Sequence, residues 1–133
     1  MTELVFFYGT LMTPFNRQGR LRVDQYLTYA GRGSIAAALF DLGIYPAAVP
    51  ASEGRVWGEL YEVAHPAIVL DALDKIEGHR PGEPESSLYT RMKTPVTLES
   101  GQQADAWAYF YNAPLGRAPR IESGDYLEHL KMK

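Results

Sequence analysis

The alternation of hydrophobic and polar positions predicts a chain built mainly from β-strands. Residues 4–8 form an unbroken run of Leu, Val, Phe and Tyr, which predicts a strand buried on both faces. Residues 26–42 are apolar and nearly uncharged, which indicates one bent strand or two short strands. Residues 56–63 alternate in character and contain aromatic side chains, which is typical of a strand. Two further strands are predicted at 88–98 and 104–111.

One segment has helical spacing. Val69, Leu73 and Ile76 fall on one face of a helix and are expected to pack inward. Pro66 suits the first turn of this helix, and Gly78 suits its C-cap. This is the clearest helix that the sequence predicts.

Turns and a short helix complete the pattern. Residues 41–47 are predicted as a turn followed by a proline-fixed segment, and residues 52–54 as a second turn. Ser123 is expected to cap a short C-terminal helix at 124–131. Several short strands with one good helix and one short helix predict a mixed α+β domain whose sheet curls into a barrel.

Composition narrows the class of protein. The length of 133 residues suits a single domain over 1–133. The absence of cysteine removes disulfides and thiolate chemistry, and the net charge of -3 with scattered Lys and Arg argues against a nucleic-acid partner. No apolar run approaches the roughly 20 residues of a membrane span, and Glu3 stands where a signal peptide carries basic residues. We expect a soluble cytoplasmic protein without a membrane partner.

The end of the first strand is a candidate binding site. Tyr8 is followed by Gly9, Thr10 and Leu11, whose backbone amides would leave the sheet together. Such a cluster of N–H groups can bind an anion. The alternative is a simple turn after a core strand.

A glycine motif in the second strand invites comparison with nucleotide-binding loops. Residues 31–36 (Gly-Arg-Gly-Ser-Ile-Ala) match part of a dinucleotide fingerprint as a bare string. That fingerprint needs a strand-to-helix turn, whereas the following residues lead to Gly43 and Pro46. A glycine bulge in a curved strand is the simpler interpretation.

Glu77 is the candidate proton-transfer group. It follows Ile76 at the predicted buried end of the helix, where desolvation would raise the pKa of its carboxyl towards the neutral range. The alternative is a solvated helix-end glutamate paired with Arg80 or Arg91. For Arg91, an ion pair with Asp74 and a substrate contact both remain open.

The histidines do not suggest a metal site. His65, His79 and His129 lack metal-ligand spacing, so surface or capping roles are expected. The sequence calls for no metal and no organic cofactor.

Five short motifs resemble those of the γ-glutamylcyclotransferase-like family, also called AIG2-like. The motifs are Tyr-Gly-Thr-Leu at 8–11, Gly-Glu-Leu-Tyr-Glu-Val at 58–63, Leu-Asp-Lys-Ile-Glu-Gly at 73–78, Tyr-Thr-Arg at 89–91 and Ala-Trp-Ala-Tyr at 106–109. Their order and spacing match over nearly the whole chain. The resemblance implies a compact β-barrel with flanking helices. It also implies that residues 8–11 line a pocket for a γ-glutamyl group and that Glu77 is the catalytic acid/base.

The chemistry implied by this resemblance is cyclisation. In a γ-glutamyl amide the α-amine attacks its own side-chain carbonyl and releases 5-oxoproline and a free amine, so no Ser or Cys nucleophile is needed. The enzyme supplies a folded substrate geometry, a proton shuttle and an oxyanion site. Tyr8, Tyr89 and Tyr111 are expected to wall the pocket and donate hydrogen bonds.

Several alternatives stay open. Thr10-Leu11 replaces the serine-asparagine version that the resemblance associates with dipeptide-type substrates, so γ-glutamylamines such as an ε-lysyl isopeptide become plausible. The loop at 80–87 is longer than a minimal member needs, and it is a candidate lid or a surface insertion. A non-catalytic module that binds a small carboxylated ligand in the same pocket is the competing function, and a regulatory interaction domain has less support. The oligomeric state is not determined by the sequence.

Overall fold

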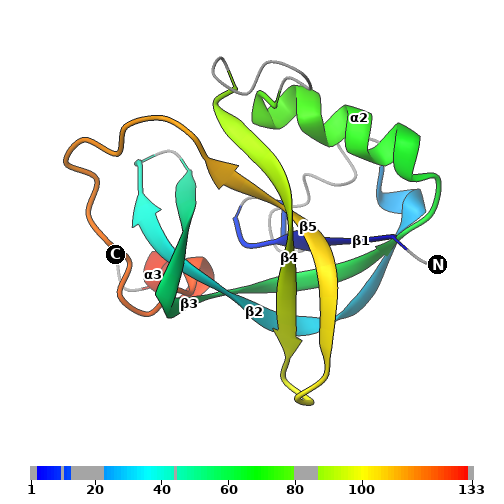
Figure 1. The fold of residues 1–133 in the computed structure, drawn as a ribbon, viewed down its shortest axis with the longest axis horizontal. Coiled ribbons are helices and arrows are strands. Elements are labelled where there is room, and N and C mark those ends of the chain that lie inside the picture. The colour runs from blue at the N-terminus through cyan, green and yellow to red at the C-terminus, as the bar shows by residue number, and fades with distance from the viewer. Residues whose placement is uncertain (1–2, 10, 13–22, 44, 80–86, 132–133) are drawn as a thin grey trace.

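The computed structural model describes residues 3–9, 11–12, 23–43, 45–79 and 87–131. Five strands close into a barrel in the order β1-β3-β2-β4-β5; one helix covers one end, and a short helix lies on the other side of the barrel, next to β2 and β3 (Figure 1). The strands are β1 (Glu3–Phe7), β2 (Leu27–Asp41), β3 (Pro46–Val63), β4 (Tyr89–Leu98) and β5 (Gln103–Tyr111). The helical elements are the 3-10 turn η2 (Asp24–Tyr26), α2 (Pro66–Glu77) and α3 (Tyr126–Lys131). The predicted mixed barrel with flanking helices is confirmed.

Two antiparallel ribbons and one short strand make the barrel. β2 and β3 pair from Leu27↔Val63 to Asp41↔Pro46, and β4 pairs with β5 along its length. β1 is antiparallel to β3 and closes the barrel through a parallel contact with β5 at Val5↔Trp107. Because β1 sits between β3 and β5, its side chains Val5, Phe6 and Phe7 are buried, as predicted for this strand.

The second strand is bent by bulges, as the sequence predicts. The β2–β3 register shifts between Tyr29 and Gly31, where Gly31 has a φ of 137°, a value that suits only glycine. Gly33 pairs with Gly58 inside the same ribbon. The glycine motif at 31–36 is therefore part of a curved strand and not a nucleotide-binding turn.

The predicted break before residue 56 is wrong. β3 runs without interruption from Pro46, and the expected turn at 52–54 is a bulge within it. Ala37 pairs with Pro50 while Ala36 pairs with Arg55, so the intervening residues of β3 stand out from the ladder. Proline and glycine suggested turns here, but pairing with β2 keeps both flanks extended.

Helix α2 follows the sequence signals at both ends. Pro66 lies in its first turn, and Gly78 caps it in the left-handed conformation with a φ of 69°. Val69 and Leu73 are fully buried against the barrel. Ile76 differs from expectation, because its side chain is 39% exposed at the rim of a cavity.

The short helix α3 is capped differently from the prediction. Asp125 Oδ1 accepts a hydrogen bond from the Glu128 amide at 3.2 Å, so Asp125 is the cap. Ser123 Oγ instead accepts from the Asp125 amide at 3.2 Å. Tyr126 is buried, whereas Leu127 and Leu130 are partly buried against the core. No helix within the described ranges is long and apolar enough to cross a membrane.

Candidate active site

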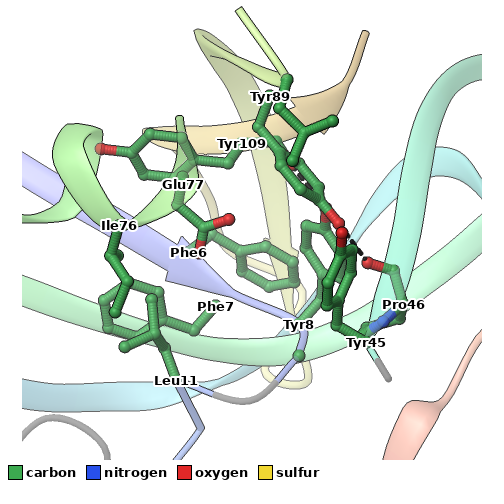
Figure 2. A pocket seen from close by; sticks show the side chains of 12 residues that line it. Phe6, Phe7, Tyr8, Leu11, Tyr45, Pro46, Ile76, Glu77, Tyr89 and Tyr109 are labelled. Atoms are coloured by element: carbon green, nitrogen blue, oxygen red, sulfur yellow. Dashed lines mark hydrogen bonds between the residues drawn. The ribbon is translucent and has the colours of Figure 1, made fainter. Parts of the chain in front are cut away.

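A cavity of about 330 Å³ opens where β1 ends beneath the C-terminal turn of α2. We call it the tyrosine pocket, because four tyrosines contribute to its wall (Figure 2). Its lining residues are Phe6, Phe7, Tyr8, Gly9, Leu11, Tyr45, Pro46, Ile76, Glu77, Leu88, Tyr89 and Tyr109. Most of these side chains are apolar or aromatic, which is typical of a small-molecule site.

The turn after β1 brings backbone to the floor of the pocket. Gly9 O accepts a hydrogen bond from the Met12 amide at 3.0 Å, which closes a tight turn. A Cβ atom at Gly9 would lie 2.9 Å from Pro46 Cγ, so only glycine fits against the start of β3. Gly9 and Leu11 both line the pocket, and Thr10 lies outside the described residues.

Glu77 is the last residue of α2, and its carboxylate points into the tyrosine pocket (Figure 2). The left-handed Gly78 ends the helix directly after it, so the chain turns away while the Glu77 side chain stays at the cavity. Glu77 is the sole carboxylate among the described lining residues, and no Lys, Arg or His occurs among them. The pocket therefore joins one acidic group to a largely apolar wall.

The hydroxyl groups of Tyr8 and Tyr89 donate hydrogen bonds to backbone carbonyls of the protein. Tyr8 Oη donates to the Tyr109 carbonyl at 2.5 Å and accepts from the Ala48 amide at 3.3 Å. Tyr89 Oη donates to the Pro46 carbonyl at 2.9 Å. Because a phenol has a single proton to donate, these hydroxyls offer a ligand lone pairs and not the hydrogen bonds expected from the sequence.

Burial keeps these phenols protonated. Loss of hydration on burial raises the pKa of Tyr8 far above its ordinary value, and the nearby charge of Glu77 raises it further. Burial is also the main cause that raises the pKa of Tyr89, with Tyr8 and Glu77 adding to it. For Tyr109, burial comes first and the hydrogen bond to Asp74 second in raising the pKa. The pocket thus presents neutral phenols around one carboxyl group.

Arg91 forms the ion pair that the sequence left as one of two options. Its Nε lies 2.9 Å from Asp74 Oδ1, and Nη2 donates to Asp74 Oδ2 at 3.2 Å. Arg91 is not a lining residue of the tyrosine pocket. The structural role is therefore the one observed.

The structure brings most of the predicted site residues together. Tyr8, Gly9, Leu11, Glu77 and Tyr89 all line the tyrosine pocket. Tyr111 is the exception: it is not among the lining residues, and its ring packs edge-on against that of Tyr89, with ring centroids 5.2 Å apart. Tyr111 therefore contacts a lining residue and does not itself form the wall.

Sequence reasoning missed two lining tyrosines, Tyr45 and Tyr109, and the proline between β2 and the body of β3. Tyr45 and Pro46 were assigned to a turn, and Tyr109 was grouped with core aromatics on a strand. The resemblance motif at 106–109 ends on Tyr109 and was the one signal that pointed to it. The loop at 80–86 lies outside the described residues, so its predicted role as a lid stays a prediction.

The histidines take structural positions. His79 Nδ1 accepts a hydrogen bond from the Arg91 amide at 3.2 Å, and His129 Nε2 lies 2.8 Å from Asp41 Oδ2. His65 stands at the N-cap position of α2, where its φ is 53°. Within the part of the chain that the structure describes, no group of three His, Cys, Asp or Glu side chains is arranged to hold a metal ion.

The fold is that of γ-glutamylcyclotransferase-like barrels. Superposition on the crystal structure of YkqA from Bacillus subtilis gives a TM-score of 0.72 at 26% sequence identity, over 99% of this chain and 42% of that one. The solution structure of YtfP from Escherichia coli gives a TM-score of 0.67 at 31% identity, over 95% of this chain and 97% of that one. The chain thus spans less than half of YkqA and nearly all of YtfP.

Sequence comparison identifies the family. Residues 5–128 match the family described as "Gamma-glutamyl cyclotransferase, AIG2-like". The chain is 32% identical over 137 residues to the γ-glutamylcyclotransferase family protein YtfP of Escherichia coli K12, covering 96% of this chain and 98% of that protein. It is also 32% identical over 129 residues to a Methanocaldococcus jannaschii protein named provisionally as a γ-glutamylcyclotransferase, with coverages of 96% and 98%. The chain belongs to the γ-glutamyl cyclotransferase, AIG2-like family.

Proposed function

We propose that this protein cleaves a γ-glutamyl amide by cyclisation, releasing 5-oxoproline and a free amine, with Glu77 as general acid and base. The observation that carries the proposal is the Glu77 carboxylate directed into an apolar, tyrosine-walled cavity of about 330 Å³ (Figure 2). The apolar and aromatic side chains around the carboxylate lower the local dielectric constant, which strengthens its interactions with a charged substrate. Family membership supports cyclotransferase chemistry on a small molecule.

Binding of the substrate amine is supported by the acceptors in the pocket. The Tyr8 and Tyr89 hydroxyls donate to backbone carbonyls, so their remaining lone pairs face a ligand as acceptors. An α-ammonium group is a pure hydrogen-bond donor with a positive charge. It therefore matches the Glu77 carboxylate and the two phenol oxygens together.

The proposed reaction moves two protons from the α-ammonium to the leaving nitrogen. Glu77 accepts the first proton from the α-ammonium, the freed amine forms a C–N bond to the side-chain carbonyl carbon, and Glu77 returns this proton to the leaving nitrogen. The newly bonded ring nitrogen then loses the second proton, which Glu77 passes to the leaving nitrogen as the bond between that nitrogen and the carbonyl carbon breaks. One ammonium hydrogen stays on the ring nitrogen, and the leaving group departs as an ammonium ion.

Geometry supplies the rest of the proposed catalysis. Holding the amine and the carbonyl of one substrate molecule in contact restricts the flexible γ-glutamyl group to a near-attack conformer. The turn at Gly9 is proposed to present backbone amides, Leu11 and Thr10 included, to the α-carboxylate or the developing oxyanion, because Gly9 and Leu11 line the cavity.

The leaving amine is proposed to lie towards the open rim of the tyrosine pocket. Ile76 and Leu88 line this rim, and their side chains are 39% and 40% exposed. γ-Glutamylamines, including an ε-lysyl isopeptide, fit the proposal alongside γ-glutamyl amino acids.

The predicted cytoplasmic location and the predicted single domain remain predictions.

The test is a product assay with a panel of γ-glutamyl amino acids, γ-glutamylamines and γ-glutamyl-ε-lysine. Mass spectrometry should detect 5-oxoproline from one class of substrate with the wild-type protein and a large loss of it with Glu77→Gln. Full turnover by a folded Glu77→Gln protein would contradict the proposed role. Ligand-induced thermal stabilisation without product would favour the competing function, a carboxylate-binding module.

A further inference from the structure

A second carboxylate lies one helical turn before Glu77 and is not used by the proposed reaction. Asp74 is only 6% exposed, although it is an acidic residue on a helix whose other face meets solvent. Acidic side chains are rarely buried unless they are paired. Asp74 therefore needs partners, and these come from the barrel.

Two different strands provide the partners of Asp74. From β5, Tyr109 Oη donates to Asp74 Oδ1 at 2.6 Å. From β4, Arg91 Nη2 donates to Asp74 Oδ2 at 3.2 Å. The Arg91 guanidinium also lies 4.6 Å above the ring centroid of Trp107, which holds it in place from the other side.

The chain just after Glu77 is attached to the same part of the barrel. The Leu88 amide donates to the Gly78 carbonyl at 3.0 Å, and the Arg91 amide donates to His79 Nδ1 at 3.2 Å. The His79 amide itself donates back to the Asp74 carbonyl at 2.9 Å. Glu77 is therefore bracketed by contacts at Asp74 on one side and at Gly78 and His79 on the other.

We propose that Asp74 is a positioning residue, which together with Arg91 and Tyr109 fixes the last turn of α2 so that Glu77 meets the substrate amine. This role rests on the proposed cyclisation. A helix end frays when it lacks tertiary contacts, and a displacement of about 1 Å in a catalytic group can cost on the order of 10²-fold in rate. The Tyr109 ring also lines the tyrosine pocket, so the network joins the helix end to the cavity wall directly.

The first variant is Asp74→Asn, which keeps the size of the side chain and an acceptor for Tyr109 but removes the negative charge facing Arg91. We expect kcat to fall on the order of 10²-fold while KM changes by less than about threefold, because the Tyr8 and Tyr89 oxygens that bind the substrate amine are untouched and only Glu77 is displaced. A merely structural residue would lower the amount of folded protein and leave kcat per folded molecule unchanged. Activity is therefore normalised to the folded fraction measured by near-ultraviolet circular dichroism.

The matched control is Asp71→Asn on the same helix. Asp71 pairs with Lys75 at 3.0 Å on the exposed face, and both side chains are largely in solvent. Its loss should leave kcat and KM unchanged. A second variant, Tyr109→Phe, keeps the ring in the pocket wall and removes only the hydrogen bond to Asp74, so it should lower kcat by about tenfold even if Asp74→Asn does not fold.

Amide hydrogen exchange separates failure of this inference from failure of the proposed function. Asp74→Asn, or Tyr109→Phe if the first variant does not fold, should lose protection at residues 74–79 while β2 and β3 keep theirs. If the wild-type protein catalyses cyclisation, a variant that loses protection at residues 74–79 and has a reduced kcat supports the inference, and a variant with unchanged kcat overturns it.

If the wild-type protein catalyses no cyclisation, the proposed function fails, and hydrogen exchange alone decides whether Asp74 fixes the end of α2. Unchanged protection in the variant then overturns this part of the inference.

Discussion

Two hollows in this small barrel contain charged and aromatic side chains, and they differ in where those side chains direct their polar atoms. The tyrosine pocket has a volume of about 330 Å³. The second hollow has about 80 Å³ and lies beside α3; its lining residues are Met12, Tyr29, Arg32, Trp57, Gly58, Glu59, Asp125 and Leu127. In the second hollow, Arg32 Nη2 lies 2.8 Å from Asp125 Oδ2, and Nη1 lies 3.3 Å from Glu99 Oε2. The Arg32 guanidinium carbon lies 4.5 Å from the ring centroid of Trp57.

The two hollows differ in whether their charged side chain is paired within the protein or directed into the cavity. In the second hollow the positive charge of Arg32 is already paired with two carboxylates and stacked on an aromatic ring of the protein itself. In the tyrosine pocket the Tyr8 and Tyr89 hydroxyls donate to backbone carbonyls, while the Glu77 carboxylate points into the cavity. A site is recognised by the atoms left facing the cavity, not by the number of polar residues near it.

The largest expected effect comes from Glu77→Gln. Neutral glutamine keeps the shape of the side chain but cannot accept and return a proton, so kcat for cyclisation should fall by about 10³-fold. Stability should change little, because Glu77 lies at a helix end beside a cavity. Steady-state kinetics with thermal unfolding as control checks this prediction, and a loss smaller than tenfold would remove Glu77 as the acid/base.

Gly9→Ala should have the next largest effect. The added Cβ would lie 2.9 Å from Pro46 Cγ, so either the β1 turn or the start of β3 must shift. Overpacking of this kind costs about 1–3 kcal/mol in unfolding free energy. We also expect kcat/KM to fall about tenfold as the turn leaves its place under the pocket.

A double variant sharpens this prediction. In Gly9→Ala with Pro46→Ala the clashing Cγ is absent, so part of the lost stability and activity should return relative to the product of the single effects. Simple additivity of the two substitutions, measured by chemical denaturation and by kcat/KM, would show that the close approach is not the cause.

Tyr89→Phe tests whether acceptor oxygens bind the substrate amine. The substitution removes one phenol oxygen from the pocket and the hydrogen bond to the Pro46 carbonyl, so KM should rise about fivefold and stability should drop by about 1–3 kcal/mol. The matched control is Tyr111→Phe, whose ring packs against Tyr89 but does not line the pocket. Equal effects of the two substitutions on KM would contradict the distinction between Tyr89, which lines the pocket, and Tyr111, which does not.

Alkaline titration tests the burial of the phenols of Tyr8, Tyr89 and Tyr109. The pKa of Tyr8, Tyr89 and Tyr109 is raised in the folded protein, chiefly by burial, so these groups ionise in the unfolded chain first. Their contribution to stability is complete below the unfolded pKa of about 10 and is lost as the pH rises above it. Tyr8, Tyr89 and Tyr109 should therefore ionise only on unfolding, which the ultraviolet absorbance of tyrosinate reports.

The smallest effect is expected in the second hollow. Arg32→Gln removes partly exposed ion pairs and should cost at most about 1 kcal/mol of unfolding free energy. Turnover should be unchanged. A clear fall in kcat/KM with intact stability would mean that the second hollow contributes to function and that the comparison drawn above fails.

Local signals predicted much of this fold. The start of α2 at Pro66 and its end at Gly78 follow from proline and glycine chemistry, and the bulged second strand follows from Gly31. The first part of β3 did not follow, because Pro46 and the run at 52–54 suggested turns while long-range pairing with β2 decides the conformation. The local sequence shows that a strand is present, but the length of the strand depends on pairing with its neighbouring strand.

The site was predictable where one segment carries it and hidden where the barrel assembles it. Tyr8, Gly9 and Glu77 stand at the ends of a strand and a helix, where the sequence itself marks the position. Tyr109 is a strand aromatic like several core residues, and only closure of β5 against β1 brings it to the cavity. Tyr111 was predicted to line the same pocket but only packs against Tyr89, because the sequence does not show which strand aromatics reach the cavity.

The most direct test of the central claim is the fate of a γ-glutamyl substrate turned over in water enriched in heavy oxygen. Intramolecular attack predicts 5-oxoproline that contains no heavy oxygen, formed by the wild-type protein and about 10³-fold more slowly by Glu77→Gln. Mass spectrometry of the products gives both quantities in one experiment. Glutamate carrying heavy oxygen would show hydrolysis by water, and equal rates for the two proteins would show that Glu77 does not move the proton; either result would contradict the account.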